Sequence, residues 1–322
     1  MGISRLLDQQ QCPDRADTQT LNSDQMTVII NGYSENRIPV LQSIAATYSV
    51  SDSVALVAIL WCNPTTNSQI LLHLSQNVST HSASIGSAPI IFVQSQSSSL
   101  NARFFPWDFI QTRGVLICDD DIHPDLNSIA FSFHVWKENP DKISGLFARS
   151  HAYDLAHKSW IYTMESRKYS IVLTKFMILK LDYLFKYSCG GGQEYVRLRE
   201  IVDERNNCED ILMNVMVADE INRGPVLVAA EKGVRDFGDA RNEGNDNSAR
   251  VVEESGGVRA VGLSSRNGDH RKRRGDCISE FHMILGKMPL RYSYGKVADS
   301  IGEQGLCLKN GKLVFCDQQI SV

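Results

Sequence analysis

Four short apolar runs, each followed by polar residues, constrain the fold of this chain more than any other feature. They lie within Gln25–Tyr33, Val54–Trp61, Pro89–Gln94 and Gly114–Cys118. Segments 38–48 and 125–138, which lie between or after these runs, carry apolar residues three or four positions apart, as amphipathic helices do. Strands that are apolar on both faces and alternate with helices favour a mostly parallel sheet covered on both sides. The predicted fold class is therefore α/β.

Polar side chains follow three of these runs directly. The segment from Asn31 to Arg37 follows the first, Asn63 follows the second, and Asp119, Asp120 and Asp121 follow the fourth. Ligands of open parallel sheets bind beyond the carboxyl ends of the strands. The sequence therefore predicts a binding site where these three polar segments meet.

The second half of the chain is more mixed. It predicts a strand over Tyr169–Thr174 and helices over 208–223 and 276–288. Residues 231–262 are rich in Gly, Asn, Asp, Glu and Arg, which predicts a flexible insertion. We expect residues 1–22 to be a flexible tail, and the length of 322 residues suggests two domains or one large α/β domain.

Charge and cysteine content exclude several classes of protein. With 33 basic and 37 acidic residues, the net charge of −4 gives no overall attraction to nucleic acid. No apolar window is long enough for a transmembrane helix, and the first twenty residues contain no signal-peptide core. The eight cysteines form no Cys-x-x-Cys pair, which argues against a structural zinc site. Their even number fits either lumenal disulfides or reduced core thiols, and the sequon at Asn77 does not decide between them.

The aspartate triplet is the strongest candidate for chemistry. Three adjacent carboxylates repel one another unless they are solvated or hold a cation. Mn²⁺ and Mg²⁺ prefer oxygen ligands shared with substrate phosphates, and the alternative is an acidic surface turn. Arg103, one loop upstream, would hold a diphosphate or order the acidic cluster, unless it is an ordinary surface residue.

Two further clusters have both a structural and a functional interpretation. Glu209 and Asp210 begin a predicted helix, where they would cap it or face a reacting sugar. The basic run from His270 to Arg274 would be an anion clamp, a nuclear-localisation patch or a solvated face. Gly190–Gly192 opens no βαβ unit and is interpreted as a loop, not as a dinucleotide fingerprint.

An ordered set of motifs then indicates a family. The set is Asn-x-Arg-Phe from Asn101, Asp-Asp-Asp-Ile from Asp119, Tyr-Ser-Ile-Val-Leu-Thr-Lys from Tyr169, Asn-Cys-Glu-Asp-Ile from Asn207, Arg-x-x-Cys from Arg274 and Gly-Lys-Met-Pro-Leu-x-Tyr from Gly286. Over residues 20 to 320, this order resembles the exostosin-type glycosyltransferases of family 64, and within them the plant C3-like members. The combination is specific, whereas an Asp-x-Asp motif alone is not.

The resemblance implies a GT-A fold, with a mixed, mostly parallel central sheet, in a single glycosyltransferase domain over residues 23–320. It implies retaining transfer of a hexose or N-acetylhexosamine from a nucleoside diphosphate sugar to a glycan or glycolipid acceptor, with Mn²⁺ or Mg²⁺. Carried over by motif, Asp210 and Arg274 match the catalytic residues and Asp121 the metal ligand. The matches to donor-binding residues are Asn31, Arg37, Asn63, Asn101, Arg103, Asp119 and Asp120. Cys208 and Cys277 match a disulfide pair, with Cys307 and Cys316 as a second candidate.

Several alternatives stay open at this point. Animal relatives carry Asp where this chain has Glu209, which leaves the role of that residue open, and the segment 231–262 has no clear counterpart. Retention could use a covalent carboxylate intermediate or same-face attack. A catalytically silent nucleotide-sugar-binding or scaffold protein is the main rival, and a nucleic-acid binder using 271–274 is disfavoured. The oligomeric state is open, and a Golgi or ER lumenal site is expected although this sequence shows no anchor.

Overall fold

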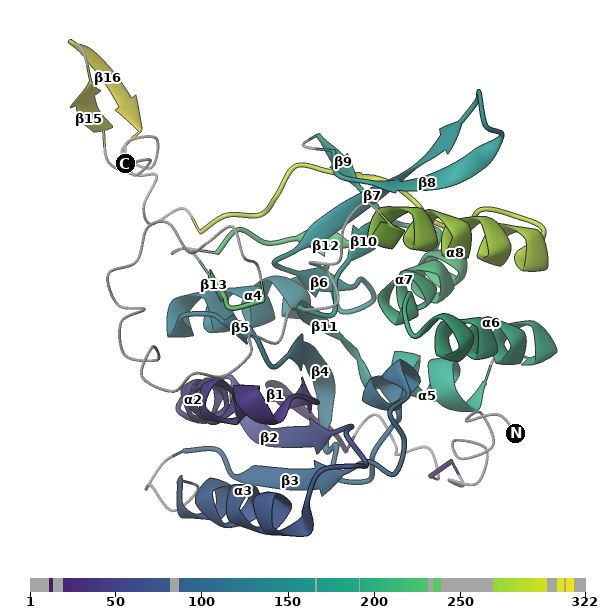
Figure 1. Cartoon of the computed structure of the whole chain (residues 1–322). Coiled ribbons are helices and arrows are strands. Elements are labelled where there is room, and N and C mark those ends of the chain that lie inside the picture. Colours follow the sequence, from purple (N-terminus) through teal and green to yellow (C-terminus); the bar gives the residue numbers. More distant parts are fainter. Residues whose placement is uncertain are drawn as a thin grey trace.

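The protein is described by a computed structural model that covers residues 12–13, 20–81, 87–165, 167–190, 192–230, 234–238, 269–299, 306–309 and 311–315 (Figure 1). Its centre is a seven-stranded sheet with the strand order β12-β6-β11-β4-β1-β2-β3. The bounds are β1 Asn22–Gly32, β2 Val54–Trp61, β3 Ile90–Gln94, β4 Thr112–Asp119, β6 Ser144–Gly145, β11 Phe176–Lys180 and β12 Val226–Leu227.

The central sheet is mixed and mostly parallel, as predicted. Strands β4, β1, β2 and β3 pair in parallel, and so do β12 and β6. Strand β11 runs antiparallel to both of its neighbours, β4 and β6. All four strands expected from the apolar runs are present and adjacent, with β4, β1 and β2 inside the sheet and the less buried β3 at its edge.

Helices cover both faces of this sheet (Figure 1). Their bounds are η1 Glu35–Arg37, α2 Ile38–Ser49, α3 Ser68–His81, η2 Leu100–Phe104, α4 Leu126–Glu138, α5 Leu181–Cys189, α6 Gly192–Arg205, α7 Glu209–Ile221 and α8 Asp269–Leu285. Two apolar cores result. Ile29 and Ile117 belong to the core that includes α5, α6, α7 and α8, whereas Ile30 and Leu116 point into the core with α2, α3 and α4. At Gly114, a Cβ would lie 2.6 Å from the ring of Trp136, so α4 packs directly on β4.

Smaller strands extend the fold beyond the main sheet. They are β5 Ile122–His123, β7 Ala148–Asp154, β8 Ser159–Thr163, β9 Lys168–Tyr169, β10 Ile171–Val172, β13 Arg235–Asp236, β14 Ser293–Tyr294, β15 Leu306–Lys309 and β16 Lys312–Phe315. Strands β7 and β8 form a hairpin that projects beside α8 (Figure 1). Strand β13 pairs with β5, directly after the aspartate triplet.

The structure differs from the sequence-based elements in three places. The strand expected over Tyr169–Thr174 is divided between β9 and β10, which pair with different partners. Helix α8 begins at Asp269, so the basic run lies inside the helix and not before it. Helices α3, α5 and α6 were not predicted from the sequence. Gly190, which was predicted to lie in a loop, does lie in the connection between α5 and α6. Of the expected insertion 231–262, only residues 234–238 are described.

Two disulfides are present among the described residues. Cys208–Cys277 confirms the predicted pair, whereas Cys12–Cys189, with a sequence separation of 177, was not predicted. Cys316, expected as a partner of Cys307, lies outside the described residues. Within the described part, no helix is both long and apolar enough to span a bilayer.

Candidate functional site

The aspartate triplet lies at the carboxyl end of β4, beside the end of β1. Asn31 of β1 is in register with Asp119. Arg37, at the end of η1, places its Nη1 2.8 Å from Asp120 Oδ1 and 3.1 Å from Asp121 Oδ2. Arg37, from the segment that follows β1, therefore provides part of the positive charge that the three adjacent carboxylates need.

Arg103 is a second cation at the same place and, unlike the partly exposed Arg37, it is buried. It is 4% exposed, and its Nη1 lies 2.9 Å from Asp119 Oδ1 and 3.3 Å from Glu209 Oε1. Because Asp119 ends β4 and Glu209 begins α7, Arg103 connects the two acidic clusters across the sheet edge. Glu209 also accepts a hydrogen bond from Thr174 Oγ1, and its burial raises its pKa.

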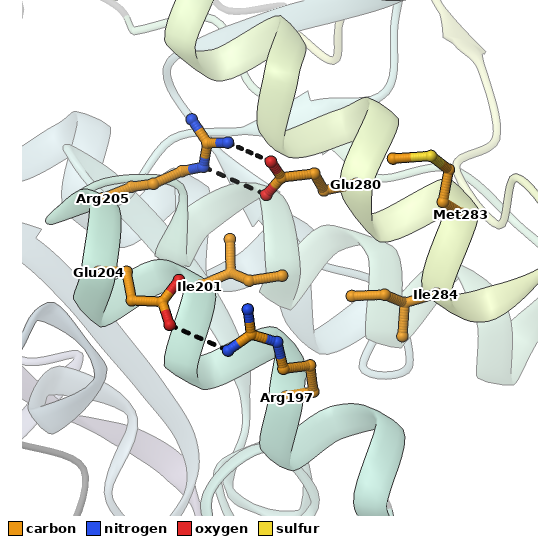
Figure 2. A pocket seen from close by; sticks show the side chains of 7 residues that line it. All are labelled: Arg197, Ile201, Glu204, Arg205, Glu280, Met283 and Ile284. Carbon is orange, nitrogen blue, oxygen red and sulfur yellow. Dashed lines mark hydrogen bonds and ion pairs between the residues drawn. The ribbon is translucent and has the colours of Figure 1, made fainter. Parts of the chain in front are cut away.

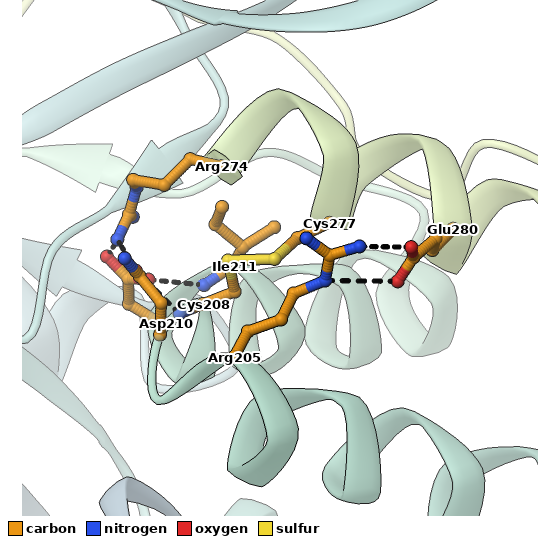
Figure 3. Close-up of a disulfide and its surroundings, with 8 residues drawn as sticks. Arg205, Cys208, Asp210, Ile211, Arg274, Cys277 and Glu280 are labelled. Carbon is orange, nitrogen blue, oxygen red and sulfur yellow. Dashed lines mark hydrogen bonds and ion pairs between the residues drawn. A yellow bond between two sulfur atoms is a disulfide. The ribbon is translucent and has the colours of Figure 1, made fainter. Parts of the chain in front are cut away.

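The second acidic cluster is an ion pair between α7 and α8. Asp210 Oδ2 lies 2.5 Å from Nη2 of Arg274, and the two side chains are 4% and 7% exposed. Arg274 Nη1 donates to Asn207 Oδ1 at 3.0 Å. The disulfide Cys208–Cys277 ties the two helices together one turn away (Figure 3). Cys208, the residue before α7, has a left-handed φ of 78°, and Glu209 and Asp210 follow it in the first turn of the helix.

The segment at 234–238 covers one side of Asp121. The backbone N–H of Phe237 donates to the carbonyl oxygen of Asp121 at 2.9 Å, and Asp236 forms an ion pair with Lys175. A Cβ at Gly238 would collide with Asp121 Oδ2, so this approach requires glycine. The backbone of this segment therefore forms a wall against the predicted metal ligand.

The electrostatics of Asp121 fit a cation. Its Oδ1 is buried without a hydrogen-bond partner. Burial, and then the neighbouring Asp119 carboxylate, raise its pKa to about 7 despite Arg37. The described residues bring together no set of three His, Cys, Asp or Glu side chains that could hold a metal. A divalent ion here would be held by one or two carboxylates and by phosphate oxygens of a ligand, as is usual for Mg²⁺.

The predicted donor-binding amides fall into two groups. Asn31 Oδ1 accepts from Cys62 Sγ at 3.3 Å, and Asn63 Nδ2 donates to the carbonyl of Tyr33 at 3.2 Å. Both therefore lie at the carboxyl ends of β1 and β2, where they were expected.

Asn101 differs from these two because it is buried and already fully hydrogen-bonded. Its Nδ2 donates to Asp203 Oδ1 and to the carbonyl of Arg199, and its Oδ1 accepts from Tyr187 at 2.5 Å. These partners belong to α5 and α6, so the amide fixes η2, the element that carries Arg103. Its predicted donor contact stays a prediction.

Three contacts of the site had not been predicted. They are the Arg103–Glu209 pair, the Lys175–Asp236 pair and the ring of Tyr162, which lies 4.4 Å from the guanidinium carbon of Arg274. Lys175 closes one of the motifs, which is a signal that could have drawn attention to it. Tyr162 lies in no motif, and nothing in the local pattern marks it.

A surface groove lies apart from these residues. It has a volume of about 380 Å³ between α6 and α8, and its lining residues are Arg197, Ile201, Glu204, Arg205, Glu280, Met283 and Ile284 (Figure 2). The Arg205–Glu280 ion pair in it lies beside the Cys208–Cys277 disulfide (Figure 3). None of the predicted site residues lines this groove.

Comparisons with known proteins show the family of this chain. The model of the glycosyl transferase family 64 domain matches residues 26–302. The chain is 59% identical over 300 residues to glycosyltransferase family protein 64 C3 of Arabidopsis thaliana, covering 93% of this chain and 88% of that protein. It is 30% identical over 262 residues to exostosin-1 of Drosophila melanogaster, covering 78% of this chain but only 31% of the exostosin. The chain thus spans about a third of that longer relative.

Two solved structures show distant likeness. One is the mannosyltransferase PcManGT from Pyrobaculum calidifontis in complex with GDP-Man and Mn²⁺, with a TM-score of 0.45, 13% identity and coverage of 74% of this chain and 64% of that one. The other is GalNAc-T7 with UDP, GalNAc and Mn²⁺, with a TM-score of 0.39, 8% identity and coverage of 55% and 38%. These scores are too low to carry an argument about this site. The family match and the observed sheet confirm the predicted α/β, GT-A type fold class.

Proposed function

We propose a reaction for this chain, which belongs to glycosyltransferase family 64 and is a glycosyltransferase. It transfers a hexose or N-acetylhexosamine from a nucleoside diphosphate sugar to a glycan or glycolipid acceptor. The transfer retains the configuration of the sugar. One observation supports this most directly. Two acidic clusters, Asp119–Asp121 and Glu209–Asp210, lie on either side of Arg103, and each also has an arginine of its own; all of these carboxylates except the partly exposed Asp119 are buried. Such a site can bind a strongly anionic leaving group and still offer a carboxylate to a sugar.

The residues at the ends of β1 and β2 would bind the nucleotide. Asn31 and Asn63 present amides there, and Arg37 lies between this region and the triplet. Polar side chains that are held at the ends of rigid strands can position a nucleotide at little cost in conformational entropy.

Asp121 would hold Mn²⁺ or Mg²⁺ together with the donor diphosphate. Its unpartnered, buried Oδ1 and its raised pKa support this assignment, because an adjacent cation would restore the charged form. When bound, such an ion stabilises negative charge on the diphosphate oxygens.

Arg274 and Asp210 would act at the reacting bond. The guanidinium of Arg274 is preorganised by Asp210 and Asn207, so it can stabilise charge that grows on the leaving diphosphate without reorganising. The Asp210 carboxylate would stabilise the positive charge that develops on the sugar or orient the acceptor hydroxyl. Retention would follow from attack on the same face as the departing phosphate, or from a covalent carboxylate intermediate.

A lumenal compartment is proposed from the two disulfides. Disulfides persist in oxidising compartments and are rare in the cytosol. A Golgi or ER lumenal site would also place the enzyme with glycan and glycolipid acceptors. Fractionation of native tissue, with an antibody to the protein, would test this.

The function is tested with a donor panel. Purified protein is assayed for sugar release from UDP-glucose, UDP-N-acetylglucosamine and GDP-mannose, with and without Mn²⁺. We expect Mn²⁺-dependent turnover of one of them, with Asp121→Ala inactive but folded. A folded wild-type protein that binds a donor and never turns it over, even with candidate acceptors, would support the catalytically silent alternative. Normal turnover by Asp121→Ala would refute the metal-ligand role.

A further inference from the structure

Arg274 is held on three sides, and one of them has no assigned role. Asp210 and Asn207 bind its terminal nitrogens, while its Nε is buried without a partner. A further contact is Tyr162 of β8: the centroid of its ring lies 4.4 Å from the guanidinium carbon, and a side-chain hydrogen bond with Arg274 acts on its hydroxyl. We propose that Tyr162 is a positioning residue for glycosyl transfer, whose ring fixes the guanidinium of Arg274 in its active orientation. The proposal rests on the proposed role of Arg274 toward the leaving diphosphate.

The hydrogen bonds hold the guanidinium only at its edge, because its N–H donors lie in its plane. Both bonded nitrogens are terminal, and the partners Asn207 and Asp210 come from the same short stretch before and within α7. A planar cation prefers the face of an aromatic ring, and this preference is stronger when both are removed from water. Tyr162 is 9% exposed and Arg274 is 6% exposed, so both conditions are met.

The hairpin that carries Tyr162 is fixed directly on α8. The backbone N–H of Trp160 donates to Ser279 Oγ at 3.1 Å. A Cβ at Gly275 would lie 3.0 Å from the carbonyl oxygen of Trp160, so the helix and the strand are in close backbone contact. Across the hairpin, Tyr162 pairs with His151. The ring therefore has little freedom to move away from Arg274.

The neutral ring is suited to this task. Burial raises the pKa of Tyr162, although the nearby Arg274 opposes the shift. The ring therefore stays uncharged at neutral pH and cannot compete with Asp210 as a counter-ion. The ring contacts the guanidinium of Arg274, and the Asp210 carboxylate provides its charge partner.

The test compares Tyr162→Leu with Tyr162→Phe in the full chain. Sugar release is measured with Mn²⁺ and the donor that turns over in the panel of UDP-glucose, UDP-N-acetylglucosamine and GDP-mannose. A desolvated cation–π contact corresponds to a loss of about 10- to 30-fold. We expect Tyr162→Leu to lower kcat by that factor while the donor KM changes less than about threefold, because the leaving-group charge grows only in the transition state. Tyr162→Phe, which keeps the ring, should stay within about threefold of wild type.

A matched control separates positioning from loss of packing. Tyr195 of α6 is 8% exposed and contacts neither Arg274 nor Asp210, so Tyr195→Leu removes a ring of similar burial. We expect it to lower the thermal midpoint and to leave kcat unchanged. If Tyr162→Leu does not fold, Tyr162→Met takes its place.

Each outcome decides the proposal. Unchanged kcat in a folded Tyr162→Leu, or equal losses in Tyr162→Phe and Tyr162→Leu, would overturn the role of the ring. An equal loss of kcat in Tyr195→Leu would show that packing alone is responsible. Failure of the proposed function is distinguished by the wild-type protein: no sugar release from any donor with Mn²⁺ and candidate acceptors refutes that function and the present proposal with it, whereas an active wild type with an unaffected Tyr162→Leu refutes only the present proposal.

Discussion

The buried ion pair between Asp210 and Arg274 allows stability and catalysis to be separated. Both side chains are less than a tenth exposed, and they join α7 to α8 over 64 residues of sequence. Replacing one partner leaves the other buried without its counter-charge, which costs about 3–5 kcal/mol. Replacing both by apolar residues of similar size removes the desolvation cost as well as the attraction, and is often neutral.

We therefore expect a characteristic double-mutant cycle. Asp210→Leu and Arg274→Met should each lower the free energy of unfolding by about 3–5 kcal/mol. The double variant should return to within about 1–2 kcal/mol of wild type. All three variants should be inactive in Mn²⁺-dependent sugar release, because each lacks at least one of the two charged groups; in the double variant, stability returns but the charges do not.

The assays are urea unfolding followed by circular dichroism and donor turnover on the same preparations. Single variants that lose less than about 1 kcal/mol would show that the pair is solvated in solution, contrary to its burial here. A double variant that recovers turnover together with stability would refute a direct role of Asp210 and Arg274 in the reaction.

Three further predictions follow from the described contacts. Gly238→Ala should weaken Mn²⁺ binding at least about tenfold with little change in the thermal midpoint, because the new Cβ would collide with Asp121 Oδ2. Binding is measured by calorimetry with UDP present, and unchanged binding would show that the segment 234–238 moves freely away from Asp121. Cys208→Ala should lower the free energy of unfolding by about 2–5 kcal/mol and reduce turnover, because the disulfide to Cys277 holds α8 on α7; peptide mapping of native protein that finds both thiols free would contradict the pairing. Burial, and then the charges of Lys168 and Arg291, lower the pKa of His151 from 6.5 to about 4. As the pH falls from 6.5 to 4, the unfolded state therefore binds a proton at this residue before the folded state does, and the free energy of unfolding should fall by about 3 kcal/mol. A His151→Phe variant whose stability has the same pH dependence would show that His151 is not responsible.

Local sequence patterns were sufficient to predict the elements that are apolar along their whole length. The run Val54–Trp61 is apolar on both faces and becomes a central strand, and the triplet after Gly114–Cys118 lies at a strand end as expected. The boundary of α8 was less accessible, because charged residues from His270 to Arg274 hide its amphipathic period. Helix α6 had the same difficulty, since most of its surface is charged and only residues such as Leu198 and Val202 face the core.

The sequence by itself determined the class of sheet, the position of the carboxylates at its edge and, through ordered motifs, the family. Only the tertiary structure decided which charges meet: Arg103 joins Asp119 to Glu209, and Tyr162 lies on Arg274. It also decided the Cys12–Cys189 disulfide. Apolar periodicity encodes which face of an element is buried, and this is a local property. The partner of a buried charge, ring or thiol depends on how distant elements pack, and no local pattern records that packing.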